Sequence, residues 1–313
     1  MKKHLISLLA ALILHHAAAG AYDFTHITTK NSALSYDGIT TIMQDSRGFI
    51  WIGTYKGLNR YDGHSMKPYF KEDIGLNSDF IHVITEDADG NLWIGTDNGV
   101  TIYNYSLDRF VPFTMLSDEG STIRNKVTFI MMDDNCAIWM LVNNQGCFSY
   151  YPESGKLKNT SYEEVGMSGF RKMVRCPDGN FYISRYHADL YHTDSLMTEV
   201  IPVRLNTPPR NLFTNDEIEG IFRREDGQLY IASTKNGISI IDPATKTAES
   251  VFALPKGALL HNAFLQNGKV FWLSTTKGVW RFDIETRESV SIRHEPKNEF
   301  SISNDYTNCT FVD

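Results

Sequence analysis

The sequence predicts an all-β fold, namely a β-propeller of four-stranded antiparallel blades with six full repeats and a partial seventh. Two observations lead to this prediction: a three-strand pattern recurs along the chain, and one aromatic position recurs at nearly constant spacing. The pattern is clearest between Ile39 and Gly63, where it reads ITTIMQDSRGFIWIGTYKGLNRYDG. It consists of short apolar, β-branched runs separated by turns that contain glycine. A single meander of this kind cannot cover both faces of its sheet, so we expect copies to stack on one another.

The aromatic position lies in the second strand of each repeat. It is occupied in turn by Trp51, Trp93, Trp139, Tyr182, Tyr230 and Trp272. The spacings between neighbours are 42, 46, 43, 48 and 42 residues. A period of roughly 40 to 50 residues, with several short strands in each repeat, is typical of propeller blades. We expect these rings to pack in the core between adjacent blades.

Residues 1–21 are predicted to be a signal peptide. Lys2 and Lys3 precede the apolar run Leu5–Leu14, which is too short for a permanent membrane span. Small residues from Ala17 to Ala21 then provide a cleavage site. The mature chain is therefore expected to be exported, which in a two-membrane bacterium means the periplasm.

Each repeat is expected to begin with an inner strand, followed by the aromatic strand, a third strand and an outer strand. The predicted inner strands are Ile39–Gln44, Ile81–Glu86, Val127–Met132, Phe170–Arg175, Ile218–Arg223 and Ala258–Leu265. The connectors 71–77, 116–124 and 206–216 are expected to cross between blades. Residues 22–313 therefore form one predicted propeller domain.

The two ends of the mature chain are predicted to share the seventh blade. Tyr22–Thr28 resembles an outer strand, and Asn304–Val312 resembles the inner strand that opens the second repeat. The two middle strands of this blade are absent from the sequence. We therefore expect an incomplete blade with open edges, in which Tyr22–Thr28 is held weakly or shifted.

The strings QDSRGFIWIGTYKGLNRYDG and EDADGNLWIGTDNGVTIY closely resemble the two-component regulator propeller repeat. The resemblance covers nearly all of the mature chain and is most specific in the first two repeats. Later repeats depart from it, as at Ala188, where the first repeat has Gly57. This family builds the sensor region of hybrid two-component systems in Bacteroides-type bacteria.

The resemblance implies a periplasmic sensor of oligosaccharides, derived from polysaccharide breakdown, that regulates transcription through a phosphorelay. The parent protein would lie in the inner membrane. It would add a second propeller, an immunoglobulin-like domain and a histidine kinase as partners of this segment, with a homodimer mate as a further partner. The sequence leaves open whether the chain is a natural truncation or a fragment.

Charge and cysteine content narrow the possible partners and cofactors. Without Lys2 and Lys3, 28 of the 30 basic residues remain against 37 acidic ones, a formal net charge of −9. This balance argues against nucleic acid or an anionic membrane as the main partner. No C-x-x-C motif or His/Cys cluster indicates a metal, and we expect no cofactor. Cys136 and Cys176 fall at the same end of adjacent blades, so a disulfide between them stays open.

The sequence contains no recognisable catalytic set. It lacks G-x-S-x-G, H-E-x-x-H, a phosphate-binding loop and a histidine-kinase box. Acidic pairs such as Asp133 and Asp134 fall in the turn after an inner strand, where aspartate binds nearby backbone N–H groups. We therefore expect this segment not to be an enzyme.

The loops between second and third strands supply the candidate binding residues, because in a propeller they lie on the same face as the inner-strand starts. The candidates are Tyr55, Lys56, Asp97, Asn98, Asn144, Gln145, Arg185, Tyr186, His187, Lys235, Asn236 and Lys277. Amides and lysines hydrogen-bond sugar hydroxyls, and aromatic rings stack on sugar faces. The fourth repeat stands out because the bulky residues Arg185, Tyr186 and His187 interrupt the G-T-x-x-G pattern of this loop. The structural alternative is that Asn and Lys simply suit tight turns.

Two other functions stay open at this stage. One is a secreted propeller enzyme, either a polysaccharide lyase or a glycosidase. The other is a protein-docking scaffold, because a fold does not determine a function.

Overall fold

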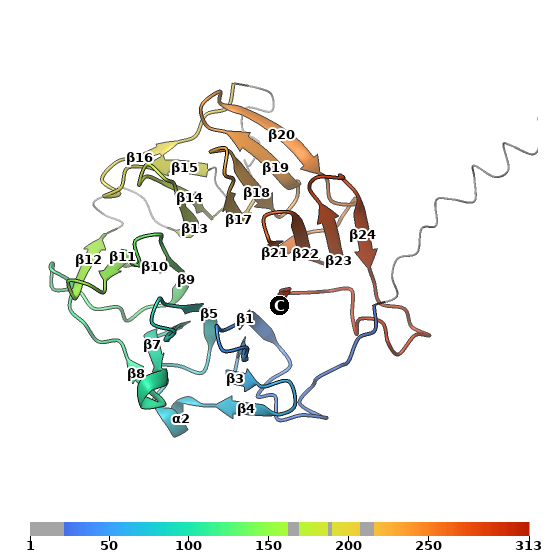
Figure 1. Cartoon of the computed structure of the whole chain (residues 1–313), viewed down its shortest axis with the longest axis horizontal. Coiled ribbons are helices and arrows are strands. Elements are labelled where there is room, and N and C mark those ends of the chain that lie inside the picture. Colours follow the sequence, from blue (N-terminus) through green and yellow to red (C-terminus); the bar gives the residue numbers. More distant parts are fainter. Residues whose placement is uncertain (1–21, 162–168, 187–189, 207–215, 313) are drawn as a thin grey trace, which may run out of the picture.

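The computed structural model describes residues 22–161, 169–186, 190–206 and 216–312. Within these ranges the chain forms six four-stranded antiparallel sheets arranged as a ring (Figure 1). In every sheet four consecutive strands pair in chain order. The predicted all-β propeller is confirmed. The predicted signal peptide, residues 1–21, lies outside the described residues.

The strands of the first three blades are β1 (Ile39–Gln44), β2 (Ile50–Thr54), β3 (Gly57–Tyr61) and β4 (Met66–Tyr69); β5 (Ile81–Glu86), β6 (Leu92–Thr96), β7 (Gly99–Asn104) and β8 (Arg109–Pro112); β9 (Val127–Met132), β10 (Ile138–Val142), β11 (Gly146–Tyr151) and β12 (Lys156–Thr160). Those of the last three are β13 (Phe170–Arg175), β14 (Phe181–Arg185), β15 (Leu190–Thr193) and β16 (Val200–Pro202); β17 (Ile218–Arg223), β18 (Leu229–Ser233), β19 (Gly237–Asp242) and β20 (Thr247–Phe252); β21 (Leu260–Gln266), β22 (Val270–Thr275), β23 (Gly278–Asp283) and β24 (Ser289–Ile292).

Two short helices interrupt the strands. The helix α2 (Lys71–Ile74) occupies the first predicted connector and ends at Gly75, whose φ of 77° is left-handed. The 3₁₀ helix η1 (Tyr105–Leu107) follows Asn104, whose side chain accepts a hydrogen bond from the Leu107 N–H. Neither is long enough to change the all-β class.

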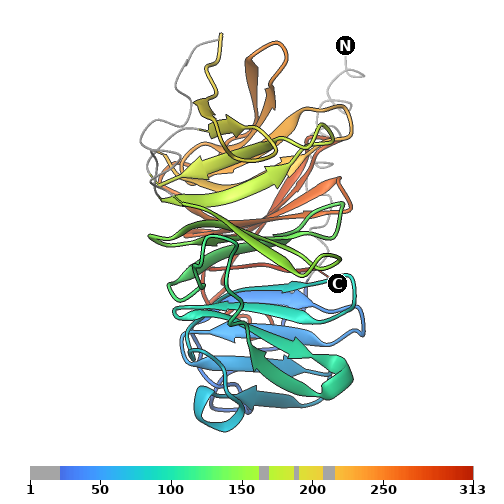
Figure 2. The same cartoon turned by 90° about the vertical axis from the view of Figure 1, so that its left-hand side faces the viewer.

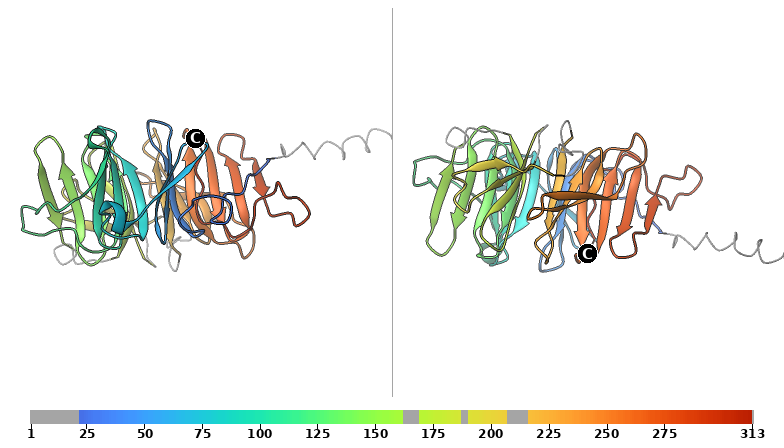
Figure 3. Two further views of the ribbon diagram at one scale, coloured as in Figure 1. Left: turned by 90° about the horizontal axis from the view of Figure 1, so that it is seen from below. Right: turned by 90° about the horizontal axis from the view of Figure 1, so that it is seen from above.

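The strands run between the two faces of a disc, as the edge-on views show (Figure 2, Figure 3). We call one the loop face: it carries the loops between second and third strands, such as Tyr55 and Lys56, and the starts of the inner strands. We call the other the turn face: it carries the turns between first and second strands, such as 45–48. The meander topology fixes this division in every blade.

The aromatic position packs against the following blade. Trp51 is fully buried with Ile81 and Leu92 of the second blade. Trp93, Trp139 and Tyr230 are also buried, as predicted, whereas Tyr182 and Trp272 are only half-buried. Trp272 belongs to the sixth blade, whose next neighbour would be the incomplete seventh, and Tyr22 lies against it with ring centroids 6.2 Å apart.

The aspartates of the turn face bind both their own turn and this aromatic ring. In the first blade Asp45 Oδ1 accepts hydrogen bonds from the N–H groups of Arg47 and Phe49, and its Oδ2 accepts the Trp51 indole N–H at 2.7 Å. The same indole bond recurs in the second and third blades at 2.8 and 2.9 Å. This supports the structural interpretation of the acidic turn residues and adds a partner that the sequence had not indicated.

Five of the six inner strands have the predicted bounds. The sixth begins at Leu260 instead of Ala258 and ends at Gln266. Ala258 is excluded because its N–H donates to the Pro255 carbonyl at 2.9 Å, which closes a turn before the strand begins.

The prediction that Asn304–Val312 forms a strand is wrong, although its register is right. The Gly278 N–H donates to the Asp305 carbonyl at 2.6 Å, as the Gly57 N–H donates to Asp79 at 2.7 Å where the second blade begins. The C-terminal end therefore lies in the inner-strand position beside β21 (Figure 1). None of the described strands pairs with it, so it lacks the ladder that defines a strand.

The predicted outer strand Tyr22–Thr28 is likewise not a strand. It lies against the outer side of the sixth blade, where the Phe24 N–H donates to the Phe300 carbonyl at 3.0 Å. His26 also binds the Ser301 carbonyl at 2.8 Å. None of the described strands pairs with Tyr22–Thr28 either.

Candidate functional site

Every inner strand carries a β-bulge close to the loop face. Its pairing with the second strand skips one residue there in all six blades. The skipped residues are all polar: Thr40, His82, Thr128, Arg171, Glu219 and His261. We call these six residues the bulge ring. Because bulges re-aim side chains and often lie next to functional sites, we take this ring on the loop face as the frame of the candidate binding site. The six inner strands that carry it surround the centre of the ring of blades (Figure 1).

Some members of the bulge ring hold neighbouring segments together. The Thr40 hydroxyl donates to the Ile81 carbonyl of the next blade at 2.7 Å. The His261 Nδ1–H donates to the Thr307 carbonyl of the C-terminal segment at 2.8 Å. His82, Arg171 and Glu219 instead belong to two side-chain clusters on opposite sides of the ring.

The first group, which we call the aromatic cluster, consists of Tyr36, Tyr55, Phe80 and His82 in the first two blades. Tyr36 and Tyr55 meet edge to face with ring centroids 6.4 Å apart, and Tyr55 and Phe80 meet at 4.8 Å. Tyr36 and Tyr55 are 46% and 50% exposed. The Lys126 ammonium lies 5.8 Å from the centroid of the Phe80 ring. The cluster thus presents aromatic surface and a cation to solvent on the loop face.

His82 forms the inner end of the aromatic cluster. Its ring lies 4.2 Å from Phe80, and its Nε2–H donates to the Asp97 carboxylate at 2.6 Å. Burial lowers the pKa of His82, and the hydrogen bond to Asp97 opposes this effect only in part. In neutral His82 the single ring proton lies on Nε2, which donates to Asp97. The other ring nitrogen, Nδ1, can therefore accept a hydrogen bond.

The second group, which we call the charged cluster, consists of Arg171, Tyr186, Glu217 and Glu219 in the fourth and fifth blades. The Arg171 guanidinium donates to both Glu219 oxygens at 3.1 and 3.2 Å and also binds the Glu217 carboxylate. It lies 4.7 Å from the centroid of the Tyr186 ring. Two carboxylates therefore share one guanidinium beneath a ring that is 41% exposed.

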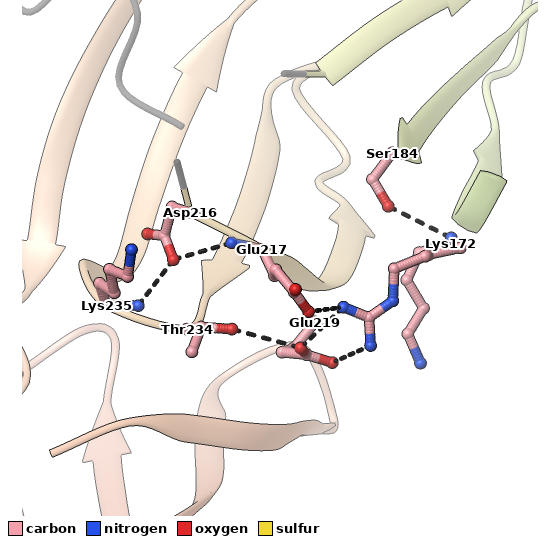
Figure 4. Close-up of polar contacts among 8 residues, drawn as sticks. Lys172, Ser184, Asp216, Glu217, Glu219, Thr234 and Lys235 are labelled. Carbon is pink, nitrogen blue, oxygen red and sulfur yellow. Dashed lines mark hydrogen bonds and ion pairs between the residues drawn. The ribbon is translucent and has the colours of Figure 1, made fainter. Parts of the chain in front are cut away.

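The charged cluster is supported from both sides. Figure 4 shows Glu217 and Glu219 together with Lys172 and Thr234. The Thr234 hydroxyl donates to Glu219 at 3.2 Å. Burial lowers the pKa of Lys172, and the Glu219 carboxylate opposes that shift. The carboxylates are thus held in place by contacts that do not depend on a ligand.

Three of the predicted binding residues hold connectors in place. The Gln145 amide accepts two backbone N–H groups of the 122–125 segment and donates to a carbonyl there at 2.7 Å. Asn236 Nδ2 donates to Asp216 at 2.8 Å, and Lys277 Nζ donates to a backbone carbonyl of the preceding connector at 2.6 Å. For these residues the structural alternative is the better interpretation.

The other predicted residues are dispersed along the loop face. Lys56, Asp97, Asn98, Asn144 and Lys235 are exposed, and Asn144 adopts a left-handed φ of 58°. Arg185 is half-buried, with its guanidinium 5.9 Å from the Tyr191 ring. His187 lies outside the described residues. Two predicted residues are members of the clusters: Tyr55 belongs to the aromatic cluster and Tyr186 to the charged cluster on the other side of the ring.

The sequence-based selection missed Tyr36, Phe80, Arg171 and the two glutamates. All lie in a connector or at the start of an inner strand, whereas the selection used only the loops between second and third strands. The sequence did contain a signal for these residues: the second residue of every predicted inner strand except the sixth is polar. In the structure the sixth inner strand begins at Leu260, so that its second residue is the polar His261. The bulge itself could not be read from the repeats.

Cys136 and Cys176 are both free thiols, so the disulfide between them that the sequence left open is not formed. Across the described ranges, no three His, Cys, Asp or Glu side chains converge so as to hold a metal ion. No helix among the described residues is long and apolar enough to cross a membrane.

A family model described as the two-component regulator propeller matches residues 33–56 and 75–98. These two stretches are two-component regulator propeller repeats. Each match runs from a connector through the inner and second strands of one of the first two blades, where the predicted resemblance is strongest. No curated protein matches the sequence.

Solved structures share the propeller fold of these repeats. The extracellular domain of BT3049 from B. thetaiotaomicron, assigned as a hybrid two-component system, superposes with a TM-score of 0.77 at 20% identity over 94% of this chain. The corresponding domain of BT4673 from the same organism gives 0.72 at 21% identity over 91%. This chain spans 39% and 36% of those two chains, respectively. Virginiamycin B lyase from Staphylococcus aureus gives 0.62 at 14% identity, over 81% of this chain and 83% of the lyase.

Proposed function

We propose that this chain is a ligand-binding propeller of a two-component signalling protein and that it binds oligosaccharides without turning them over. The two-component regulator propeller repeats and the fold shared with sensor extracellular domains support the signalling role. The observation that carries the ligand proposal is the aromatic cluster, which exposes Tyr36 and Tyr55 on the loop face. Exposed aromatic faces next to polar groups are suited to sugar rings.

The proposed location is the periplasm, and the proposed partners are the remaining domains of the sensor polypeptide together with a homodimer mate. The apolar N-terminal run and its cleavage site favour export. Signal output would then be the task of a kinase elsewhere in the polypeptide, to which ligand binding on the loop face would be coupled.

The proposed binding site includes both the aromatic and the charged cluster of the loop face. Tyr55 would stack on one sugar ring, while Tyr186 and the carboxylates of Glu217 and Glu219 would meet hydroxyl groups of another. Lys56, Asn98 and Lys235 are exposed on the same face and would extend the contact.

A lyase is the second candidate, because the His82–Asp97 pair could act as a general base. The pair has suitable geometry, with 2.6 Å between Nε2 and Oδ1, and a base can be recognised by such an orienting carboxylate. The lyase candidate needs a proton acceptor that faces the substrate, which would be His82 Nδ1. A His82→Gln variant separates the two functions, since only the lyase would lose turnover.

The test is to incubate the purified protein with digests of plant and host glycans and to measure retention and products. We expect binding without new reducing ends or unsaturated sugars. Alanine at Tyr55, Lys56, Asn98, Tyr186, His187 and Lys235 together should abolish binding. Alanine at Gln145, Asn236 and Lys277, which hold connectors, serves as the matched control for loop integrity. Turnover that is lost in His82→Gln would instead establish the lyase, and binding that survives all six alanines would refute the site.

A further inference from the structure

A concave site on the turn face lies between the fifth and sixth blades. It is a pocket of about 440 Å³ bordered by residues 223–226 and 267–269 of the two turns and by Ile284 and Glu285. This volume falls within the range of roughly 300–1,000 Å³ that is usual for small-molecule sites. The buried Tyr230 forms its floor. The pocket is on the opposite face from the aromatic cluster, so it is a separate site.

An arginine replaces the repeat's aspartate at this pocket. Where the first three blades have an aspartate bound to tryptophan, the fifth has Arg224 bound to Tyr230, with Nη1 donating to the phenol oxygen at 3.0 Å. Asp226 takes over the turn by accepting the Gln228 N–H at 3.1 Å. The substitution therefore places a guanidinium in the pocket, and this guanidinium is not needed to hold the turn.

Arg224 keeps hydrogen-bonding capacity beyond its contacts in the described residues. Its Nε and Nη2 face the Asp226 carboxylate at 3.2 and 2.9 Å, and Nη1 binds Tyr230. These contacts use three of the five N–H donors of a guanidinium. On the opposite wall Lys269 pairs with Glu285 at 3.2 Å, and both side chains are about two-thirds exposed, at 66% and 67%.

The charge pattern of the pocket disfavours an anionic ligand. Each cation has a carboxylate partner: Arg224 is matched by Asp226, Lys269 by Glu285, and Arg223 by Asp134 at 3.0 Å. An anionic ligand would have to displace one of these partners and would also meet the Glu225 carboxylate, which lines the pocket. A hydroxyl group both donates and accepts, so it can bridge a cation and its carboxylate without breaking the pair. Several adjacent hydroxyls on one small ring meet this requirement.

We propose that this turn-face pocket binds a neutral sugar unit, with Arg224, Asp226 and Lys269 contacting its hydroxyl groups. The site is independent of the proposed loop-face function. A sugar bound here contacts two blades at once and so bridges the fifth and sixth blades. Either site can exist without the other, and variants on the two faces tell them apart.

The experiment is titration calorimetry of the full chain with maltose, cellobiose and xylobiose as neutral probes and digalacturonate as the acidic probe. We expect saturable binding of at least one neutral probe with a Kd of about 10 mM or tighter, and none of digalacturonate. Arg224→Gln and Lys269→Ala should each weaken that binding by about tenfold or more, because each removes charged donors to the sugar.

Two variants serve as controls. Arg47→Gln removes a turn-face arginine of the first blade, and Tyr55→Ala removes the centre of the aromatic cluster; both should leave the turn-face affinity unchanged. If Arg224→Gln fails to fold, Lys269→Ala still decides the matter, because both members of its ion pair are largely exposed. The site is overturned if no neutral probe binds, if digalacturonate alone binds, or if binding falls with Tyr55→Ala and not with Lys269→Ala. The last result would at the same time support the loop-face function.

Discussion

The first three blades and the last three have different residues at the turn position that faces the polar atom of the aromatic ring. In the first three, a turn aspartate accepts the indole N–H of Trp51, Trp93 or Trp139. In the sixth blade Gln266 accepts the Trp272 N–H at 2.9 Å. In the fifth blade the direction of the hydrogen bond is reversed, because Arg224 donates to the hydroxyl oxygen of Tyr230. In the fourth blade Cys176 stands at the aspartate position, six residues before Tyr182. The comparison teaches that a blade does not require aspartate at this position.

This difference separates structural positions from those available for binding. Where the aspartate is retained, the turn carboxylate is fully used by its own backbone and by the ring. In the fourth and fifth blades, where it is replaced, the carboxylate of the turn lies two residues on, at Asp178 and Asp226. The vacated position then carries a side chain that can meet a ligand.

The largest effect is expected when the aromatic position itself is truncated. Trp51→Ala removes a fully buried ring that packs against the second blade, and should cost about 3–5 kcal/mol of the free energy of unfolding. Trp272→Ala should cost clearly less, because this ring is only half-buried. Urea denaturation followed by far-UV circular dichroism measures both. Equal losses would contradict the proposed difference between closed and open ends of the ring.

A smaller effect is expected at the turn partner of the ring. Asp87→Ala leaves the Trp93 indole and two backbone N–H groups without their acceptor, and should cost about 1–3 kcal/mol. Arg224→Gln should cost less than about 1 kcal/mol, since glutamine can still donate to the Tyr230 oxygen. Melting temperatures of the two variants, compared with Asp89→Ala as an exposed control, measure the difference. A greater loss in Arg224→Gln would mean that the arginine is structural.

The smallest effect concerns a feature that both halves share. Asp62, Asp242 and Asp283 accept backbone N–H groups of the turns between third and fourth strands, which holds the pKa of each below its ordinary value, to about 2 for Asp62. A depressed pKa in the folded state stabilises the fold above the unfolded value of 3.8, and that contribution is lost as the pH falls toward 2. Unfolding measured between pH 5 and pH 2, in steps of about one unit, should therefore show a shallower acid dependence in Asp62→Asn and Asp283→Asn than in the unchanged protein. The two halves should respond alike, and a response in one half only would show that these turns are not equivalent.

Much of the fold was predictable because it repeats. The aromatic spacing located all six second strands, and the repeated apolar, β-branched runs located five inner strands to the residue. The state of the C-terminal segment was not predictable. The C-terminal segment has the residues of an inner strand and even its register contact at Asp305, yet a strand depends on a neighbour that pairs with it.

The candidate site was predictable only in part. The selection of loops found Tyr55 and Tyr186, which the structure places at the two clusters. It missed Tyr36 and Arg171 because their positions depend on bulges and connectors, which repeat in geometry more than in sequence. It also included Gln145, whose amide is used by the backbone of a connector.

The central claim is that the loop face binds an oligosaccharide without chemistry. Hydrogen–deuterium exchange, with and without the glycan fraction that the protein retains, tests it most directly when the same sample is assayed for new reducing ends. The account predicts slower exchange in the peptides around Tyr36, Tyr55, Phe80 and Tyr186, no change around the turn at Asp45, and no new reducing ends. Unchanged exchange at those loop-face peptides, or product formation in the sample, would contradict it.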